Sequence, residues 1–222
     1  LSLYLLAARR AAPGPRPALP PAPQGAPVVW FDLGARDDIA GLAQLARRMR
    51  IARPGMAFLL TATAGAPAAG GFPEGTVALP RPADRLPDLH GFLDHFDPGL
   101  VVLAAPDLPP ALIHAARARG LSVALVDLEL AEGAALPWRW SVGMAGALLR
   151  RLGLILARDR TTERGLMRTA GPGLAVHVTG RIEGAVVESD IDVLVWSDIV
   201  GGSMERGIVE TYVQLARTAW AL

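Results

Sequence analysis

The chain contains neither cysteine nor lysine. Without cysteine it cannot form disulfides, use a thiolate as a nucleophile or hold zinc through cysteine. All 22 basic residues are arginine, and they are interspersed with 21 acidic residues to leave a formal net charge of +1. A general nucleic-acid binder needs a concentrated basic face, so no nucleic-acid partner is expected.

Several common sequence motifs are missing as well. The four histidines do not follow a metal-ligand spacing such as HExxH, so neither a metal nor a cofactor is predicted. The glycine pairs at 70–71 and 201–202 are not followed by the Lys-Ser/Thr of a phosphate-binding loop, and no GxGxxG fingerprint is present. No apolar run reaches the length that is needed to span a bilayer.

The composition favours a folded and rather apolar domain. Hydrophobic residues make up 51% of the 222 residues and charged residues 19%, which argues against general disorder. This length suffices for one sizeable domain with a true core. The mean hydropathy of +0.33 is high for a soluble protein and indicates contact with something apolar.

The N-terminal segment falls into two parts. The first eight residues, LSLYLLAA, are apolar and are followed by Arg9 and Arg10. They could be the tail of a membrane or signal segment, a short anchor at a membrane interface, or a helix that packs on the domain. Residues 12–27 hold seven prolines and predict an extended linker. We therefore expect an N-terminal segment over residues 1–27 and a fold that begins near Val28.

From Val28 onward, apolar runs alternate with helical patterns. Strands are expected at residues 28–32, 56–61, 76–79, 100–104, 122–126, 153–157 and 174–179, and helices at 38–50, 84–95, 108–119, 141–151 and 159–170. The β-branched run at 100–104 is typical of a buried parallel strand. This alternation predicts an α/β fold in which a parallel sheet carries helices on both faces.

The rhythm weakens after Gly184. Residues 192–196 are compatible with one more strand, and residues 204–221 predict an amphipathic helix. We expect this helix to pack on the same sheet, although a helix in this place can also cross to another domain. Residues 186–222 are therefore treated as a C-terminal extension.

Two carboxylates mark the point where the first strand leads into the first helix. An apolar strand ends in a short loop, and Asp37 and Asp38 follow at the start of a predicted helix. In an open α/β sheet ligands bind outside the carboxyl ends of the strands, so a carboxylate in this place faces a ligand cleft. Acidic residues are also common in first turns, where the helix dipole favours negative charge. The residue types leave open a catalytic carboxylate and an ordinary helix start.

The order and spacing of several segments over residues 28–185 resemble the N-terminal domain of Kdo transferases. These glycosyltransferases add 3-deoxy-D-manno-octulosonic acid (Kdo) to lipid A. Their tryptophan-led strand is followed by a short loop that ends in a catalytic glutamate at a helix start. Here the segment reads WFDLGARDD, and Asp38 falls on that glutamate. The segment LPRPADRLPDLHGFLDHFDPGLVVL resembles the family's proline-and-acid segment and the strand after it.

The resemblance implies further site residues that would bind substrate. The threonine-rich turn of the family is LLTATAG here, with Thr61 and Thr63. The acid-rich turn before a helix start is AAPDLPPALI, with Asp107, and VTGRIE keeps Gly180 of a V-T-G-x-x-K segment. The same residue types also permit structural roles: the threonines could close a turn, and Asp107 could cap a helix, which we expect of it.

The chain departs from the family pattern at charged positions. Asp127 stands for asparagine, Glu129 for arginine and Glu183 for lysine, while Asp38 is one methylene shorter than glutamate. The acidic replacements predict weaker attraction for anionic sugars and phosphates. A shorter base must still reach the hydroxyl that it deprotonates.

The resemblance implies a Rossmann-like domain that forms the N-terminal, acceptor-binding half of a GT-B glycosyltransferase. Such an enzyme transfers Kdo from CMP-Kdo to a lipid A-type acceptor in lipopolysaccharide biosynthesis, with Asp38 as the base. It works without metal at the cytoplasmic face of the bacterial inner membrane, in peripheral contact with it. The family's donor-binding half has no counterpart in these residues, so we expect the chain alone not to transfer sugar.

Two other classes remain open. The inverted charges at Glu129 and Glu183 favour a non-catalytic, degenerate paralogue that binds a lipid or a protein partner. A different sugar-modifying enzyme, such as a sugar epimerase, would need another set of acid and base residues, and the sequence does not offer one.

Overall fold

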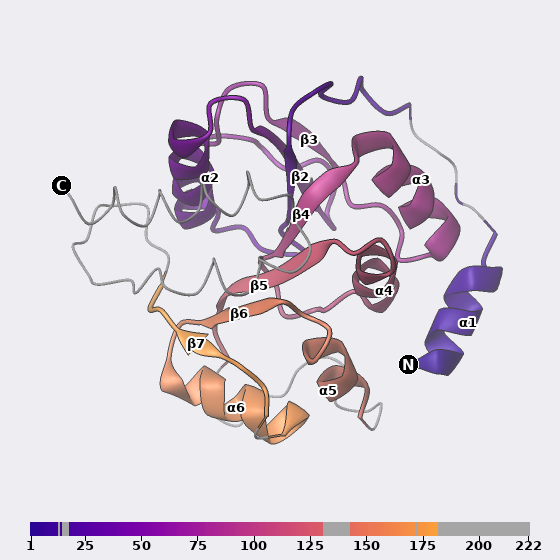
Figure 1. Ribbon diagram of the computed structural model, residues 1–222, viewed down its shortest axis with the longest axis vertical. Coiled ribbons are helices and arrows are strands. Elements are labelled where there is room, and N and C mark those ends of the chain that lie inside the picture. The colour runs from indigo at the N-terminus through magenta and orange to yellow at the C-terminus, as the bar shows by residue number, and fades with distance from the viewer. Residues whose placement is uncertain (13, 15–17, 131–142, 172, 182–222) are drawn as a thin grey trace.

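The computed structural model describes residues 1–12, 14, 18–130, 143–171 and 173–181. Seven parallel strands form one sheet in the order β3-β2-β1-β4-β5-β6-β7 (Figure 1). The strands are β1 (Val28–Asp32), β2 (Ala57–Ala62), β3 (Val77–Pro80), β4 (Pro98–Leu103), β5 (Ser122–Leu128), β6 (Leu154–Ala157) and β7 (His177–Val178). The parallel sheet predicted from the alternating pattern is confirmed.

The strand order reverses between β1 and β4. Both β2 and β4 pair directly with β1, so that Asp32 at the end of β1 lies beside Thr61 of β2 and Leu103 of β4. The chain builds the sheet outward in one direction through β2 and β3, and then in the other direction from β4 to β7. Ligands of open α/β sheets bind at such a reversal, outside the carboxyl ends of the strands.

Six helices connect or flank the described strands. They are α1 (Ser2–Arg10), α2 (Ala40–Ala52), α3 (Leu86–Phe96), α4 (Pro110–Ala118), α5 (Met144–Leu149) and α6 (Arg160–Ala170). The largest differences from the sequence-based boundaries are a start of α5 at Met144 instead of residue 141 and a β7 of two residues. Helix α2 begins at Ala40 instead of Asp38. Helix α6 begins one residue after the predicted residue 159, because the Asp159 carboxylate caps the helix by accepting the Thr162 N–H at 2.7 Å.

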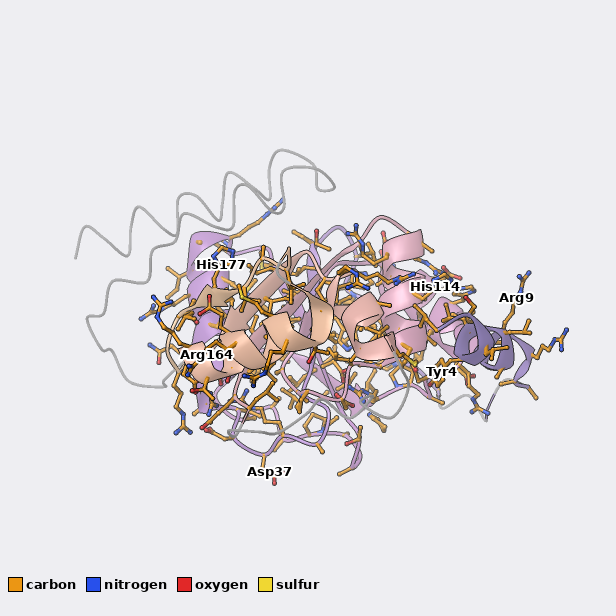
Figure 2. The ribbon with its side chains drawn as sticks, turned by 90° about the horizontal axis from the view of Figure 1, so that it is seen from below. Tyr4, Arg9, Asp37, His114, Arg164 and His177 are labelled. Atoms are coloured by element: carbon orange, nitrogen blue, oxygen red, sulfur yellow. The ribbon has the colours of Figure 1, made fainter. Side chains whose placement is uncertain are left out.

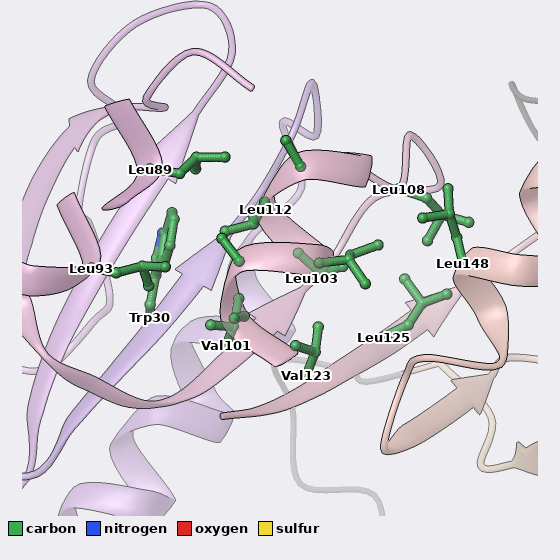
Figure 3. Packing of buried hydrophobic residues seen from close by; sticks show 14 of the residues in the cluster. Trp30, Leu89, Leu93, Val101, Leu103, Leu108, Leu112, Val123, Leu125 and Leu148 are labelled. Atoms are coloured by element: carbon green, nitrogen blue, oxygen red, sulfur yellow. The ribbon is translucent and has the colours of Figure 1, made fainter. Parts of the chain in front are cut away.

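The larger core cluster covers the sheet face on which α3 and α4 pack. Trp30 of β1 is fully buried there, and its ring centroid lies 4.8 Å from that of Phe92 on α3. Leu89 and Leu93 of α3, together with Leu112 of α4, cover neighbouring strand residues (Figure 3). Residues of α5 and α6 extend the same cluster toward β6.

A second core cluster fills the opposite face. It contains Phe31 of β1 and Phe58 of β2, and α2 contributes Leu42, Ala46 and Met49. Among the described helices, α2 is the one that contributes to this cluster. The sheet therefore carries helices on both faces, as the sequence predicted.

The N-terminal segment is packed onto the larger core. Tyr4, Leu5 and Ala8 of α1 lie against that cluster, whereas Leu3 is 83% exposed and Leu6 44% exposed. The structure thus realises the third interpretation of these residues, a helix that packs on the domain. Among the described residues, no helix is long and apolar enough to cross a membrane.

The described residues of the proline-rich linker contact α3 in two places. The Gly14 N–H donates to Asp88 at 3.0 Å, and the Pro20 carbonyl lies 2.8 Å from the His95 ring. The strand expected at 192–196, the helix expected at 204–221 and the rest of the extension from residue 186 lie outside the described residues.

Candidate functional site

Charged side chains gather at the carboxyl ends of the strands, which we call the carboxyl edge. Asp32 ends β1, Asp127 lies near the end of β5, and Arg81 and Arg158 directly follow β3 and β6. Asp32 and Asp127 are almost completely buried, with 0% and 3% exposure. Buried charges need partners, and arginines from the same edge supply them.

Arg81 joins two carboxylates at the β1–β4 reversal. Its Nε lies 2.9 and 2.8 Å from the two carboxylate oxygens of Asp32, and its terminal nitrogens pair with Asp32 and with Asp107. Asp107 lies in the loop after β4, and its side chain is 37% exposed. This three-residue ion-pair cluster therefore runs from the buried sheet to the surface of the reversal.

Asp32 is also held by a chain of hydrogen bonds inside the sheet. The Trp30 Nε1–H donates to the Thr61 hydroxyl at 2.9 Å, and that hydroxyl donates to Asp32 at 2.9 Å. Thr61 is fully buried, so its hydroxyl positions the Asp32 carboxylate and does not face solvent. Burial raises the pKa of Asp32 above its ordinary value, although the hydrogen bonds and charge of Arg81 and the Thr61 bond act in the opposite direction.

The side chain of Arg36 connects the β1–α2 loop to the ends of β4 and β5. Its Nε donates to the Asp38 carbonyl at 2.6 Å, and its Nη1 lies 3.3 Å from the Ala104 carbonyl and 3.4 Å from the Asp127 carbonyl. Its other terminal nitrogen pairs with the Asp127 carboxylate. The loop that carries Asp38 therefore leans over the ends of β4 and β5.

Asp127 lies between two guanidinium groups. Besides Arg36 it binds Arg158 in a two-point contact, with distances of 2.8 Å from Nε to Oδ1 and 2.8 Å from Nη2 to Oδ2. Arg158 also pairs with Glu129, whose side chain is 59% exposed. The backbone of Asp127 has φ 55°, in the left-handed region, which costs an L-residue of this kind about 1 kcal/mol.

Asp38 lies at the surface of this edge. Its side chain is 51% exposed and pairs with Arg181, which follows β7. The hydrogen bond from Arg181 is the main cause that holds the pKa of Asp38 below its ordinary value. Asp38 precedes α2 by two residues, and the neighbouring Asp37 is exposed and points away from the molecule (Figure 2).

The other predicted residues lie on the same edge. The Thr63 hydroxyl donates to the Gly34 carbonyl at 2.8 Å. Gly34 has φ 60°, and a Cβ at this position would lie 3.1 Å from an Asp107 oxygen, so the loops after β1, β2 and β4 meet here. Gly180, with φ 76°, follows β7 and directly precedes Arg181. The fold thus brings Asp38, Thr63, Asp107 and Gly180 to one edge.

The expectation that Asp107 caps a helix is wrong. Asp107 pairs with Arg81, and the first backbone N–H groups of α4 are bound by Asp84 instead. The Ala111 N–H lies 3.1 Å and the Leu112 N–H 2.8 Å from the Asp84 carboxylate oxygens. The cap comes from a residue that is distant in sequence, so a local pattern could not reveal it.

The sequence analysis missed the arginines that organise the edge. Arg81, Arg158 and Arg181 each follow a strand and each pair with an acidic residue from another strand end. A charged residue within two positions of a predicted strand end is the signal that could have identified them. Their positions also change the meaning of the acidic replacements, because arginines from elsewhere balance Asp127 and Glu129. Within the described ranges, no cluster of side chains is suited to hold a metal ion.

A comparison of the sequence with known protein families shows to which family the chain belongs. A family model described as 3-deoxy-D-manno-octulosonic-acid transferase (kdotransferase) matches residues 8–184. The chain belongs to this family. The match begins in the last turn of α1 and includes the proline-rich linker and every described strand, so the kdotransferase domain begins well before Val28. None of the curated proteins matches the chain in sequence.

The solved structures that match this kdotransferase domain share little sequence with it. UDP-GlcNAc 2-epimerase from Neisseria meningitidis is 16% identical, with a TM-score of 0.47, over 70% of this chain and 47% of its own. The glycosyltransferase SnogD from Streptomyces nogalater is 16% identical, with a TM-score of 0.40, over 96% of this chain and 45% of its own. The chain spans about half the length of these proteins.

Proposed function

We propose that this chain is the acceptor-binding half of a glycosyltransferase that transfers Kdo from CMP-Kdo to a lipid A-type acceptor in lipopolysaccharide biosynthesis. The observation that carries the proposal is the carboxylate of Asp38 at the carboxyl edge of a parallel sheet, in a chain of the kdotransferase family. Ligands of such sheets bind at this edge. The site of action is the cytoplasmic face of the inner membrane.

In this mechanism Asp38 acts as the general base. Its carboxylate takes the proton of an acceptor hydroxyl, and the resulting alkoxide oxygen forms a bond to the anomeric carbon of Kdo. The bond from that carbon to the CMP phosphate breaks, and CMP leaves with the electron pair. Asp38 is half exposed, so an acceptor can approach it from solvent within the hydrogen-bond distance that proton transfer requires.

The neighbouring residues have separate roles in this proposal. Asp107 is partly exposed beside the β1–α2 loop and is placed to accept hydrogen bonds from acceptor hydroxyls. Thr63 holds the Gly34 carbonyl and so fixes the loop, while the buried Thr61 acts through Asp32. Gly180 provides the turn that presents Arg181.

The N-terminal helix supports a peripheral contact with the membrane. Leu3 and Leu6 are exposed on α1, and Arg9 points away from the molecule at its end (Figure 2). Apolar side chains next to arginines suit the boundary between acyl chains and anionic head groups.

The proposal is tested with the complete protein that the gene encodes, given CMP-Kdo and a lipid A precursor. Mass spectrometry of the lipid product should show transfer by the wild type and by D37N. D38N should lose at least about a hundredfold in rate, which is the usual contribution of a general base. Full activity of D38N would contradict the role of Asp38, and no transfer by the wild type would contradict the proposed reaction.

The 222-residue chain by itself is expected to show no transfer, because donor binding in this family needs a second domain. The same assay applied to this chain checks the expectation. Steady turnover would show that these residues bind the donor without further help.

A non-catalytic binding module is the second candidate. It is favoured by the charge inventory of the carboxyl edge, where Arg36, Arg81, Arg158 and Arg181 all pair with carboxylates of the chain itself. A decayed paralogue would bind a lipid A precursor with the same affinity in the wild type and in D38N, and neither would turn it over.

A further inference from the structure

One ion pair connects distant strands of the carboxyl edge. Asp38 belongs to the loop after β1, and Arg181 follows β7, yet their side chains are in contact. Three strands, β4, β5 and β6, lie between β1 and β7 in the sheet. Since neighbouring strands are about 4.8 Å apart, the ends of β1 and β7 are separated by roughly 19 Å. The pair therefore closes a span across the intervening strand ends.

The β1–α2 loop covers the first part of that span. Arg36 bonds to the carbonyls of Ala104 and Asp127, so its side chain reaches from the loop across the ends of β4 and β5. Arg181 meets it from the other side, after the Thr179 N–H has bonded to the Ala157 carbonyl at the end of β6 at 3.0 Å. Loop and ion pair together form a continuous strap across the edge.

Arg181 differs from the other arginines of the edge in its exposure. The side chains of Arg36, Arg81 and Arg158 are 12 to 16% exposed, and each is held by at least two separate residues. The side chain of Arg181 is 53% exposed and pairs with Asp38, itself 51% exposed. Solvent-exposed ion pairs contribute little net free energy, typically below about 1 kcal/mol, so this one can exchange partners at low cost.

We propose that Arg181 is the oxyanion-binding residue of this edge and that Asp38 is its resting partner, which a phosphate or carboxylate group of the ligand displaces. This inference rests on the proposed function, since it concerns the same edge and the same base. A guanidinium binds phosphate and carboxylate groups through two parallel hydrogen bonds. A ligand anion that takes over Arg181 releases the Asp38 carboxylate, which is then available to accept the proton of an acceptor hydroxyl.

The exchange of partners explains how Asp38 can act as a base although it pairs with a cation in the resting protein. In the resting protein Arg181 makes Asp38 a weaker base, as the lowered pKa shows. When a ligand anion neutralises Arg181, the basicity of Asp38 rises only in the complex that holds a substrate. The ligand therefore completes the site that acts on it.

The test is calorimetric titration of the 222-residue protein with inorganic phosphate and, in a second series, with free Kdo, whose charged group is a carboxylate. D38N removes the internal competitor and should bind the anion roughly fivefold more tightly than the wild type. D37N removes the same charge from the adjacent, exposed position and should change the affinity less than about twofold. R181Q and the double variant R181Q/D38N should show no saturable binding.

The two series distinguish the source of the oxyanion. A gain in D38N with phosphate alone indicates a phosphoryl group, a gain with Kdo alone indicates a sugar acid, and a gain with both supports oxyanions in general. Equal gains in D38N and D37N, retained binding in the double variant, or no gain with either probe would overturn the proposal.

A second measurement does not depend on affinity. The Nε–H resonance of Arg181 in nuclear magnetic resonance spectra should shift on addition of phosphate, and that of Arg158 should not, because the Arg158 side chain is 16% exposed and its Nε is bound to the buried Asp127. None of these titrations involves sugar transfer. If the protein transfers no Kdo but binds the anions as expected, only the proposed reaction is contradicted. If it transfers Kdo but does not bind the anions in this way, only the exchange of partners at Arg181 is contradicted.

Discussion

At the level of single residues, the carboxyl edge holds two carboxylates in opposite surroundings. Asp32 is completely buried and held by Arg81 and Thr61, whereas Asp38 is half exposed beside Arg181. Burial raises the pKa of the first, and the neighbouring guanidinium lowers that of the second. The same residue type therefore serves as a fixed structural charge in one place and stands as an accessible surface carboxylate in the other.

Removing Arg181 should raise the pKa of Asp38. In the folded protein this pKa lies below its ordinary value because the charged form is favoured, so R181Q should bring it back toward that value. The carboxyl ¹³C chemical shift of Asp38 across a pH titration measures the change directly. In the complete enzyme, the acid limb of the rate profile should move to higher pH as well. An unchanged titration of Asp38 would show that the two side chains do not pair in solution.

Removing Arg81 should be far more costly than removing Asp107. R81M leaves the Asp32 carboxylate buried without its counter-ion, and breaking a buried pair in this way costs about 3–5 kcal/mol. The loss should be smaller at acidic pH, since a protonated Asp32 needs no counter-ion and a folded-state pKa above the unfolded one makes stability fall as pH rises. D107N affects a partly exposed partner and should cost below about 1 kcal/mol. Urea unfolding at two pH values measures the loss in free energy of unfolding for each variant. Equal losses in R81M and D107N would argue against a buried charge at Asp32.

At the level of elements, local patterns identified the strands and helices, but long-range contacts set several of their ends. The helix expected from residue 38 begins at Ala40, because Arg36 binds the Asp38 carbonyl and Ile39 has ψ near 0° in a non-helical conformation. The ion pairs among Arg81, Asp32 and Asp107 join residues 26 to 49 positions apart. The periodicity of a short sequence window does not report contacts between residues so far apart. The position of the site at the carboxyl edge could therefore be predicted, whereas the arginines that pair with its carboxylates could not.

Asp84 connects α1 with α4, and its removal should show this. Its carboxylate accepts the first N–H groups of α4 and the Tyr4 hydroxyl of α1 at 2.7 Å. Y4F removes one hydrogen bond and should cost about 1 kcal/mol. D84A also removes the acceptor for two backbone groups at a helix start and should cost roughly 2 kcal/mol or more. Denaturant midpoints give both values; a larger loss in Y4F would contradict the capping role.

At the level of the whole molecule, the N-terminal segment belongs to the same packed body as the sheet. Helix α1 packs on the larger core, and the linker is bonded to α3 at Gly14 and Pro20. The sequence predicted the extended linker and the parallel sheet, because both follow from composition and periodicity. It left the place of α1 open, since an apolar octapeptide suits a bilayer surface and a protein surface equally well.

Deleting residues 1–26 should therefore destabilise the sheet without dismantling it. The deletion uncovers apolar side chains of α3 and α4 and loses the partial burial of Tyr4, Leu5 and their neighbours, about 3 kcal/mol in total. Far-ultraviolet circular dichroism should keep its α/β character while the urea midpoint falls. Leu3→Ser, at a position that is 83% exposed, serves as the control and should stay within about 0.5 kcal/mol of the wild type.

The left-handed backbone of Asp127 limits the order in which its surroundings can change during evolution or engineering. Glycine would fit φ 55° without strain, but it would remove the carboxylate that pairs with Arg36 and would leave Arg158 with Glu129 alone. Replacing either arginine first would leave the buried Asp127 carboxylate with one of its two guanidinium partners. Each single substitution is then less favourable than the starting protein, even where replacing all three residues together is harmless. This epistasis predicts that the three side chains are inherited as a unit.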